Sequence, residues 1–266
     1  MKPIKVVVHG ALGRMGQTLV NALCRQPDMQ IVGAVDLKAT DDSLSLPDGS
    51  GRVPLSSKLE LILTAVQPEV MVDFTTAEAV MPAVRTAAEH GVNLVIGTTG
   101  LTAENIKAIE SLAKAHKIGA VVAPNFALGA VLMMHLAKLA GKHLDYAEII
   151  ELHHERKVDA PSGTALSTAR AMAQARGRPF STPPAGKKLA SRGEAVEGIS
   201  IHSVRLPGLM AHQEVMLGGE GQTLSIRHDQ ISREAFMPGV LLAVREAAKQ
   251  KGLTYGLESL LGLEKK

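Results

Sequence analysis

Apolar residues gather in short, uninterrupted runs along the first half of the chain, and this pattern predicts buried β-strands. In the first run, Ile4–Gly10, three consecutive valines leave no alternation between apolar and polar positions. Similar runs recur at residues 31–36, 70–74, 92–97 and 118–124. Helical spacing is found at residues 13–24, 77–91 and 102–117, with Gly91 as a helix end and Thr102 as a helix start. The alternation predicts an α/β fold with a Rossmann-like, doubly wound parallel sheet.

The pattern changes after Phe126, where a second domain is predicted to begin. A helix with one strongly apolar face is expected at residues 128–143, a strand at 146–154 and a helix at 162–175. Three strand-like runs follow closely, at residues 199–206, 212–219 and 222–229, which is typical of an antiparallel or mixed sheet. The tail, residues 233–251, is helical, with Pro238 in its first turns or at a break. Segments rich in glycine, serine and proline at residues 38–57 and 177–194 are predicted to be mobile loops.

Composition narrows the class of protein. Of the 266 residues, 45% are hydrophobic and 21% are charged, which is ordinary for a soluble globular chain. No apolar run approaches the roughly 18 residues of a membrane span, and the run at Val6–Val8 is too short for a signal peptide. The single cysteine, Cys24, excludes an intrachain disulfide framework and a multi-thiolate metal site. We therefore expect a cytoplasmic protein with no membrane partner.

Charge and aromatic content bear on the ligand. The formal net charge is +3, with basic residues spread along the chain, and four phenylalanines and two tyrosines are the only aromatic side chains of the Phe, Trp and Tyr types. So few aromatic rings argue against a platform on which nucleic-acid bases stack. A mild positive charge favours the approach of small anionic ligands. We expect no nucleic-acid partner.

A glycine motif follows the first predicted strand and opens the first predicted helix. In HGALGRMG, glycines 10, 13 and 16 allow a tight turn and a close approach of the backbone to a pyrophosphate at the helix N-terminus. Asp36 ends the second strand, where a carboxylate can hold the adenosine ribose hydroxyls. The same carboxylate repels a 2′-phosphate, although Lys38 or Arg14 could compensate, so NADH or dual use is favoured. The alternative is a glycine-rich turn that binds nothing.

Three polar turns end successive predicted strands. They are DFTT at residues 73–76, IGTTG at residues 96–100 and APNF at residues 123–126. Ligands of open α/β sheets bind beyond the carboxyl ends of the strands, so these turns are predicted to lie near a nicotinamide. Each one alone could be an ordinary turn, because Gly, Thr, Asn and Pro favour turns regardless of function.

The segment ELHHERKVDAPSGT, residues 151–164, carries the candidate chemistry. If its first part is extended, His153 and Lys157 share one face and His154 points the other way. Ser162 is a natural N-cap, which leaves the amides of Gly163 and Thr164 for an anion. Together these groups suit an anionic substrate that accepts a proton. A metal site is disfavoured, since neither H-E-x-x-H nor a Cys/His set is present, and a purely structural polar loop is the other alternative. The histidines on the later strands, His202, His212 and His228, are predicted to be packing or surface residues.

These motifs resemble those of the 4-hydroxy-tetrahydrodipicolinate (dihydrodipicolinate) reductase family over almost the whole chain. HGALGRMG, DFT, GTTG and APNF are similar, in order, to its cofactor-contacting turns, and ELHHERKVDAPSGT is similar without a gap to its E-x-H-H-x-x-K-x-D-A-P-S-G-T motif. The resemblance implies that His153 donates a proton and that Lys157 assists it. It implies substrate contacts at His154, Gly163 and Thr164. It implies cofactor contacts at Gly10, Ala11, Leu12, Gly13, Arg14, Met15, Asp36, Gly97, Thr98, Thr99, Ala123, Pro124, Asn125 and Phe126.

The resemblance also implies an architecture and a reaction. A dinucleotide-binding domain at residues 1–126 is completed by residues 238–266, and an inserted α+β domain at residues 127–237 binds a cyclic dicarboxylate and builds a homotetramer. The reaction is the NADH- or NADPH-dependent reduction of 4-hydroxy-tetrahydrodipicolinate to tetrahydrodipicolinate in diaminopimelate and lysine biosynthesis. One departure concerns the cofactor: Leu37 stands where some members carry an arginine for the 2′-phosphate.

Two alternative functions belong to other classes. A different small-acid dehydrogenase on the same scaffold, such as an aspartate dehydrogenase, would use the same cofactor domain, and a substrate screen separates it. A non-enzymatic module that senses the NADH/NAD⁺ ratio would bind NADH without turning over any dicarboxylate imine. That module would leave the lysine and the helix start after His153 without a purpose.

Overall fold

The protein consists of two compact units, here called unit 1 (Met1–Phe126 with Phe236–Lys266) and unit 2 (Ala127–Ala235). The computed structural model describes residues 2–182 and 190–263. The second division falls at residues 235/236, where the sequence suggested 237/238, because a short 3-10 turn, η2 (Arg233–Phe236), precedes the helix α7 (Met237–Ala247).

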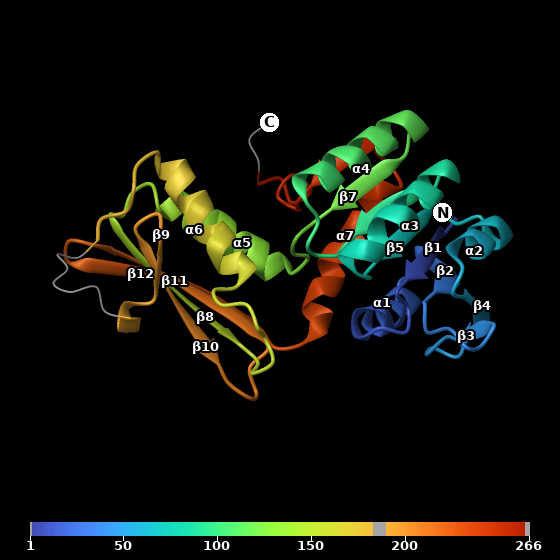
Figure 1. Ribbon diagram of the computed structural model, residues 1–266, viewed down its shortest axis with the longest axis horizontal. Helices are drawn as coiled ribbons and strands as arrows, with labels where there is room; N and C mark the ends of the chain where they lie inside the picture. Colours follow the sequence, from blue (N-terminus) through green and yellow to red (C-terminus); the bar gives the residue numbers. More distant parts are fainter. Residues whose placement is uncertain (1, 183–189, 264–266) are drawn as a thin grey trace. The chain divides into compact units, whose positions relative to one another are not determined.

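Unit 1 is built on a twisted, mostly parallel sheet (Figure 1). Over the described residues its strand order is β13-β7-β6-β5-β1-β2-β4-β3, and β3 is antiparallel to β4 while the other pairs are parallel. The predicted Rossmann-like sheet is therefore confirmed. The strands are β1 (Ile4–His9), β2 (Met29–Val35), β3 (Ser43–Ser45), β4 (Arg52–Ser56), β5 (Val70–Asp73), β6 (Asn93–Ile96), β7 (Gly119–Val122) and β13 (Gly252–Tyr255).

Helices cover both faces of this sheet (Figure 1). On one face α1 (Arg14–Cys24) contacts α7, and on the other α3 (Ala77–Glu89) contacts both α2 (Leu59–Val66) and α4 (Ala103–His116). The apolar strand runs are buried on both sides, which explains why they read as continuous rather than alternating. The predicted helix ends are confirmed: Gly91 has a φ of +69°, and Thr102 forms a capping box with Asn105.

Parts of unit 1 were not predicted from the sequence. The segment at residues 38–57, expected to be a mobile loop, contains the hairpin β3–β4, and α2 and β13 were missed as well. The loop prediction was wrong because it rested on composition. Within RVPLS, Val53 and Leu55 are buried and alternate with exposed residues, which is the period of a strand with one buried face. Of the second predicted loop, residues 183–189 lie outside the described part of the chain.

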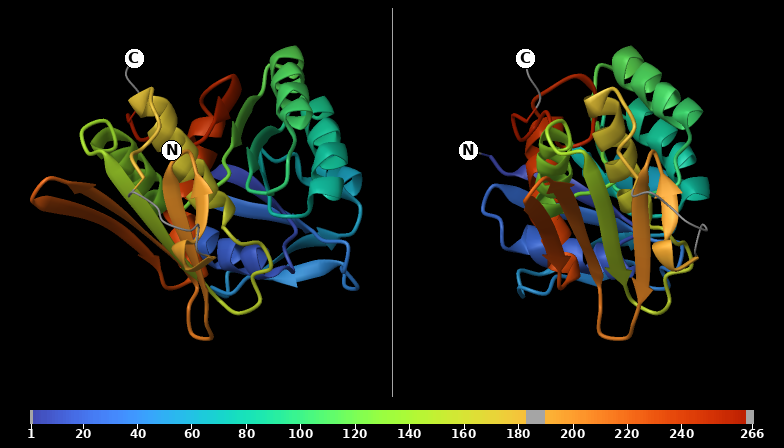
Figure 2. Two further views of the ribbon diagram at one scale, coloured as in Figure 1. Left: turned by 60° about the vertical axis from the view of Figure 1, so that its left-hand side comes forward. Right: turned by 90° about the vertical axis from the view of Figure 1, so that its left-hand side faces the viewer.

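Unit 2 is a mixed sheet with two helices on one face (Figure 2). Over the described residues the strand order is β12-β11-β8-β10-β9, in which β8 and β10 are parallel and the other pairs antiparallel. The expected mixed sheet is thus confirmed, and its core lies between the sheet and the helices. The elements are α5 (Leu128–Ala140), β8 (Tyr146–His153), α6 (Gly163–Arg176), η1 (Ala190–Arg192), β9 (Glu194–Val196), β10 (Ile199–Arg205), β11 (Ala211–Gly219) and β12 (Gln222–Gln230).

Membrane-spanning helices and metal clusters are both absent from residues 2–182 and 190–263. No helix in that part of the chain combines the length and apolarity that a membrane span requires. Nor do those residues contain three or more His, Cys, Asp or Glu side chains grouped as metal ligands.

Candidate functional site

The glycine loop of unit 1 is shaped by two close backbone approaches. Gly10 has a φ of +84°, and a Cβ on it would lie 2.8 Å from the carbonyl oxygen of Phe74. A Cβ on Gly16 would lie 2.1 Å from the carbonyl oxygen of Gly10, so α1 packs directly on the loop. Only glycine fits at these two positions, which explains the spacing of the motif.

The N-terminus of α1 is open to an anion. The amides of residues 10 to 13 all donate hydrogen bonds within the loop or to the end of β2. The first bond of the helix runs from the amide of Gln17 to the carbonyl of Gly13, at 2.9 Å. The amides of Arg14, Met15 and Gly16 therefore lie at the helix start, where a helix leaves its donors unsatisfied and a phosphate is favoured.

Asp36 closes the loop from the end of β2. Its Oδ2 accepts a hydrogen bond from the amide of Leu12 and its Oδ1 one from the amide of Lys38, both at 2.9 Å. A carboxylate oxygen accepts more than one bond, so both oxygens retain capacity for a ribose hydroxyl. The neighbouring Leu37 is 82% exposed.

A cavity of about 550 Å³ in unit 1 lies beside this loop. Three of the predicted cofactor residues line it, namely Gly10, Gly13 and Asp36. The rest of the lining comes from residues near the ends of β1, β2 and β5 and from two helices: His9, Leu37, Lys38, Leu59, Phe74, Thr75, Thr76, Ala79, Pro82, Ala83 and Thr86. The glycine cradle, the open helix start and Asp36 fit a dinucleotide.

Other predicted cofactor residues support the wall of this cavity from behind. A Cβ on Gly97 would lie 2.2 Å from the ring of Phe74, and the buried ring of Phe126 meets the same ring edge-on at a centroid distance of 6.0 Å. Ala123 is buried as well, whereas Thr99 and Pro124 are exposed and Asn125 is half-buried. The contacts of residues 97 and 126 thus position Phe74.

An unpredicted network lies at the ends of β1 and β5. The Nδ1 atom of His9 is 2.6 Å from Oδ2 of the fully buried Asp73. The hydroxyl of Thr98, a predicted cofactor residue, donates to Asp73 Oδ1 at 2.6 Å, and Thr75 adds its hydroxyl and its amide. The available signal was that His9 and Asp73 end strands that are neighbours in a doubly wound sheet; they are register partners.

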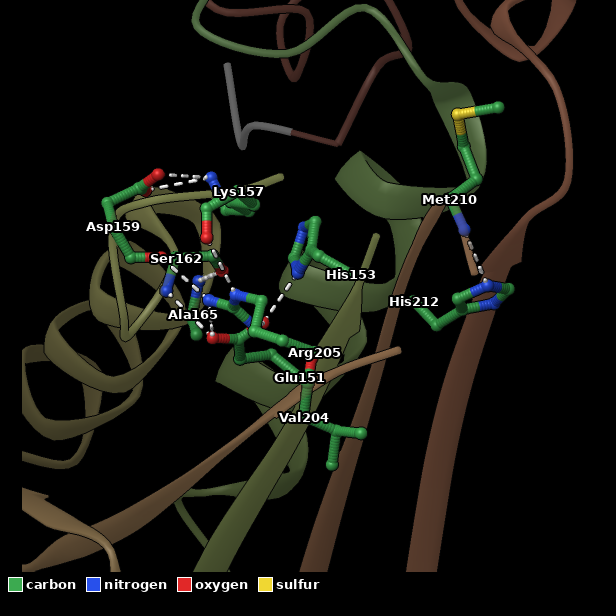
Figure 3. Close-up of polar contacts among 10 residues, drawn as sticks. All are labelled: Glu151, His153, Lys157, Asp159, Ser162, Ala165, Val204, Arg205, Met210 and His212. Carbon is green, nitrogen blue, oxygen red and sulfur yellow. Dashed lines mark hydrogen bonds and ion pairs between the residues drawn. The ribbon is translucent and has the colours of Figure 1, made fainter. Parts of the chain in front are cut away.

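In unit 2 the centre of the candidate chemistry is Glu151, which the sequence reasoning did not name as a site residue. Its carboxylate is buried and accepts hydrogen bonds from Nδ1 of His153 at 2.5 Å and from the amide of Ser162 at 3.2 Å (Figure 3). Burial alone would raise the pKa of this carboxyl, but hydrogen bonds from His153, Arg205 and Ser203 outweigh it and lower the pKa to about 2. Glu151 is therefore ionised at neutral pH.

Arg205 is the second residue that the sequence reasoning missed. Its guanidinium binds both carboxylate oxygens of Glu151, at 2.8 and 2.9 Å. It also donates to the backbone carbonyls of Lys157 and Asp159, which holds the segment after β8 in place (Figure 3). It lies 54 residues from Glu151 in sequence, on β10, so only the pairing of β8 with β10 brings the two together.

The carboxylate fixes the orientation of His153. An ionised carboxylate can only accept hydrogen bonds, so Nδ1 of His153 carries a proton and Nε2 is the atom left for a substrate. The negative charge of Glu151 compensates the positive charge that the imidazole carries when it acts as a proton donor. The signal for this pair was available, because residues 151 and 153 lie on the same face of a strand.

The strand β8 ends at His153, so the extended chain on which the shared face of His153 and Lys157 depended is absent between these residues. Residues 155 and 156 form a turn, in which the amide of Lys157 donates to the carbonyl of His154. The ammonium of Lys157 pairs with both oxygens of Asp159 at 2.8 Å, and these bonds lower the pKa of the Asp159 carboxyl. His154 is half-buried, and its Nδ1 has no hydrogen-bond partner among the described residues.

The start of α6 has the expected cap. The Ser162 hydroxyl accepts a hydrogen bond from the amide of Ala165 at 3.2 Å, which confirms Ser162 as the N-cap. The amides of Gly163 and Thr164 occupy the first turn, and a Cβ on Gly163 would meet nothing within 4 Å. An anion such as a carboxylate fits at this helix start.

The remaining predicted histidines of unit 2 have structural partners. His202 pairs with Glu148 at 2.9 Å, and His212 pairs with Asp229 at 2.7 Å. His228 packs against Gly129, and burial lowers the pKa of its imidazole. Their partners fit the packing and surface roles expected from the sequence.

Comparisons with known proteins cover nearly the whole chain. The family model described as dihydrodipicolinate reductase, N-terminus, matches residues 4–126, and the one described as dihydrodipicolinate reductase, C-terminus, matches residues 129–261. The 4-hydroxy-tetrahydrodipicolinate reductase of Dehalococcoides mccartyi is 57% identical over 263 residues, which is 99% of this chain and 100% of the relative. The 4-hydroxy-tetrahydrodipicolinate reductase of Moorella thermoacetica is 49% identical over 261 residues, which is 97% of this chain and 98% of the relative.

Solved structures agree with these matches. A dipicolinate-bound dihydrodipicolinate reductase from Paenisporosarcina sp. TG-14 is 41% identical, with a TM-score of 0.85 over 97% of this chain and 99% of that one. An amine dehydrogenase from Mycobacterium smegmatis is 17% identical, with a TM-score of 0.64 over 94% of each chain, and this likeness concerns the fold alone.

Proposed function

The chain belongs to the 4-hydroxy-tetrahydrodipicolinate reductase family, and from this premise we infer that it reduces 4-hydroxy-tetrahydrodipicolinate to tetrahydrodipicolinate with NADH or NADPH. It is an oxidoreductase of lysine and diaminopimelate biosynthesis. The similar reductase from Paenisporosarcina was solved with dipicolinate bound, which supports a small cyclic dicarboxylate as the substrate class. The observation that carries the assignment to residues is the Glu151–His153 pair at the end of β8, followed in the same motif by the open start of α6.

Unit 1 is the proposed cofactor-binding unit. When bound, the reduced dinucleotide supplies a hydride from nicotinamide C4. The amides at the start of α1 hold its pyrophosphate, Asp36 holds the adenosine ribose, and the loop glycines allow the close approach. The predicted contacts at residues 97–99 and 123–126 remain part of the proposal, and residues 97 and 126 are supported by their packing behind Phe74.

His153 is the proposed proton donor. Loss of the 4-hydroxyl group of the substrate as water leaves a conjugated imine. Hydride addition to this imine leaves negative charge on the ring, and the protonated imidazole neutralises that charge by giving its Nε2 proton to the ring. Glu151 holds Nδ1, so the imidazole cannot rotate away, and Arg205 fixes Glu151 in turn. The positioned imidazole avoids the reorganisation that a mobile acid would require.

Lys157, His154 and the start of α6 are the proposed substrate contacts. The amides of Gly163 and Thr164 bind one carboxylate of the substrate, and the orphaned Nδ1 of His154 contributes a polar contact. Lys157 supplies positive charge. Since its ammonium pairs with Asp159 in this structure, we expect a substrate carboxylate to compete with that side chain.

The cofactor preference is proposed to be NADH, or dual use of NADH and NADPH. Asp36 repels a 2′-phosphate, and the exposed Leu37 offers no charge where an arginine would bind one. Lys38 lines the same cavity and supplies the one nearby ammonium of the lining residues, which supports dual use.

A homotetramer in the cytoplasm is also proposed. Unit 2 exposes Leu132, Leu136, Leu139 and Leu224, and a groove of about 650 Å³ between α5 and β12 is lined by several of these apolar residues. Burial of this surface between copies supports the expected assembly. The free thiol of Cys24 supports a reducing compartment.

Initial-rate kinetics on enzymatically generated 4-hydroxy-tetrahydrodipicolinate, with NADH and NADPH in turn, test the function. We expect turnover with this substrate and none with aspartate or its imine. Turnover of aspartate instead would favour the amino-acid dehydrogenase alternative. Tight NADH binding without turnover of any dicarboxylate would favour the redox-sensing module.

A further inference from the structure

A buried histidine–carboxylate pair in unit 1 has no residue role in the proposed function, although His9 opens HGALGRMG and Asp73 opens DFT. His9 ends β1 and directly precedes the glycine loop. Its side chain is 11% exposed and that of Asp73 is fully buried, and Nδ1 of His9 lies 2.6 Å from Oδ2 of Asp73. A buried carboxylate needs compensation, so this pair calls for a physical account.

The protonation of this pair follows from its partners. The Thr98 hydroxyl oxygen accepts a hydrogen bond from the amide of Thr75, with a distance of 2.9 Å between the two atoms. The hydroxyl therefore donates its own proton to Oδ1 of Asp73, which lies 2.6 Å away. The hydroxyl and amide of Thr75 also donate to Asp73, at 2.9 and 3.1 Å. Oδ1 of Asp73 thus accepts three hydrogen bonds, and Oδ2 lies 3.2 Å from the Thr75 hydroxyl. This arrangement suits an ionised carboxylate, to which Nδ1 of His9 donates its proton. The free atom of the imidazole is Nε2.

The imidazole borders the cavity proposed for the dinucleotide. His9 lines it together with Gly10, Gly13 and Asp36, next to the loop that fits a pyrophosphate. A neutral imidazole would present a lone pair from Nε2, which repels a phosphate oxygen. An imidazolium would present an N–H, which forms a charge-assisted hydrogen bond with it.

The charges around His9 favour the imidazolium form once an anion is bound in the cavity. Asp73 faces it from β5, and Asp36 and Lys38 border the cavity from the end of β2. On α1, Arg14 is exposed and is absent from the cavity lining, and the lining residues of α3 are uncharged. The sole side chain of the described residues that forms an ion pair with Asp73 is His9 itself. With His9 neutral the pair has a charge of −1, and with His9 protonated it is neutral.

We propose that His9 is a cofactor-binding residue that takes up one proton from solvent as the dinucleotide binds, so that its imidazolium lies between Asp73 and a phosphate of the cofactor. This inference rests on the proposed dinucleotide binding of unit 1. It adds a cofactor contact at a residue to which the resemblance assigns none, and it makes cofactor affinity depend on pH.

Calorimetric titration of NADH into the full-length protein, in phosphate and in Tris buffer at one pH, measures the number of protons taken up. We expect uptake by the wild type and a loss of affinity of up to about tenfold for each pH unit above neutrality, the linkage limit for one proton. His9→Asn retains a donor for Asp73 but lacks Nε2. It should take up no proton and bind NADH about tenfold more weakly, the scale of a charge-assisted hydrogen bond. His116→Gln, an exposed histidine of α4, should match the wild type.

Two results would overturn the inference. One is wild-type affinity and wild-type proton uptake in His9→Asn. The other is NADH binding by the wild type without proton uptake. A third result has a wider meaning. If the wild type binds neither NADH nor NADPH, the proposed cofactor role of unit 1 is overturned together with this inference. The first two results overturn the inference alone.

Discussion

The two units each place a histidine on a buried carboxylate at the end of a strand, and the two pairs differ in one neighbour. In both, Nδ1 of the imidazole meets the carboxylate, at 2.6 Å for His9 and Asp73 and at 2.5 Å for His153 and Glu151. The carboxylate of Glu151 also binds the guanidinium of Arg205, whereas the other partners of Asp73 are threonine hydroxyls and an amide.

This neighbour changes the net charge of each cluster. With its histidine protonated, the cluster of Glu151, Arg205 and His153 carries +1, and loss of the proton restores neutrality. The pair of Asp73 and His9 is neutral with the proton and carries −1 without it. The same geometry therefore suits release of a proton to a substrate in unit 2 and retention of a proton beside an anion in unit 1.

The largest expected effect separates the two histidines by kinetics. His153→Gln should lower kcat by roughly 10²- to 10⁴-fold, the usual contribution of a general acid, and leave the Kd for NADH nearly unchanged. Steady-state kinetics and a fluorescence titration of NADH measure the two quantities. His202→Gln, which also removes a histidine–glutamate pair from unit 2, is the matched control and should retain activity. Full activity in His153→Gln would refute the assignment of the proton donor.

The next effect separates the two carboxylates by stability. Glu151→Gln leaves the half-buried guanidinium of Arg205 without its counter-ion, so we expect the free energy of unfolding to fall by up to about 3–5 kcal/mol. Asp73→Asn leaves no guanidinium without a counter-ion, so the free energy of unfolding should fall by about 1–3 kcal/mol. Differential scanning calorimetry of both variants beside the wild type gives the order. If the thermal midpoint of Glu151→Gln equals or exceeds that of Asp73→Asn, Arg205 does not depend on Glu151 as its counter-ion.

A third effect concerns acid. Because hydrogen bonds lower the pKa of folded Glu151 to about 2, its contribution to stability is fully present above the unfolded value near 4.5 and is lost as the pH falls toward 2. The shift corresponds to about 3 kcal/mol. Between about pH 4.5 and pH 2 the free energy of unfolding should therefore fall more for the wild type than for Glu151→Gln. Between pH 7 and pH 5 the two proteins should show the same change. Denaturant unfolding at several pH values measures this, and parallel curves in the acid window would contradict it.

The smallest expected effect is confined to unit 1. Leu37→Arg should lower the KM for NADPH by about tenfold through a charge-assisted contact with the 2′-phosphate, and it should change the KM for NADH little. The side chain is exposed, so the substitution disturbs no core. Leu37→Gln, a long side chain without charge, is the control. Equal responses of the two cofactors to Leu37→Arg would show that residue 37 does not face the 2′ position.

What the sequence predicted well depends on neighbours along the chain. The glycine loop, the capping box at Thr102 and the N-cap at Ser162 each follow from residues within a few positions of one another. The apolar strand runs were equally clear, since a parallel sheet with helices on both faces buries its strands completely. These features were enough to predict the fold class, the glycine loop of unit 1 and the helix start at Ser162 in unit 2.

What it missed depends on pairing between distant segments. Arg205 reaches Glu151 only because β10 lies parallel to β8, and no local pattern reports that pairing. His9 and Asp73 likewise meet across neighbouring strands, 64 residues apart in sequence. The end of the strand at His153 was left open by the sequence, because the turn that follows is closed by a backbone hydrogen bond from Lys157 to His154 that no residue pattern there reports.

The chain leaves unit 1 after Phe126 and returns to it at Phe236, and this order of connection has a consequence for synthesis on the ribosome. The helix α7, whose residues Val240, Leu241 and Val244 are buried, packs beside α1 on one face of the unit 1 sheet, and β13 pairs with β7 at its edge. Neither exists when the first 126 residues emerge. Unit 2 is continuous and can complete its core first, whereas the nascent unit 1 exposes an apolar sheet face and an unpaired edge until the last thirty or so residues arrive. The interval in which this protein is most prone to aggregate is therefore the translation of its own second unit.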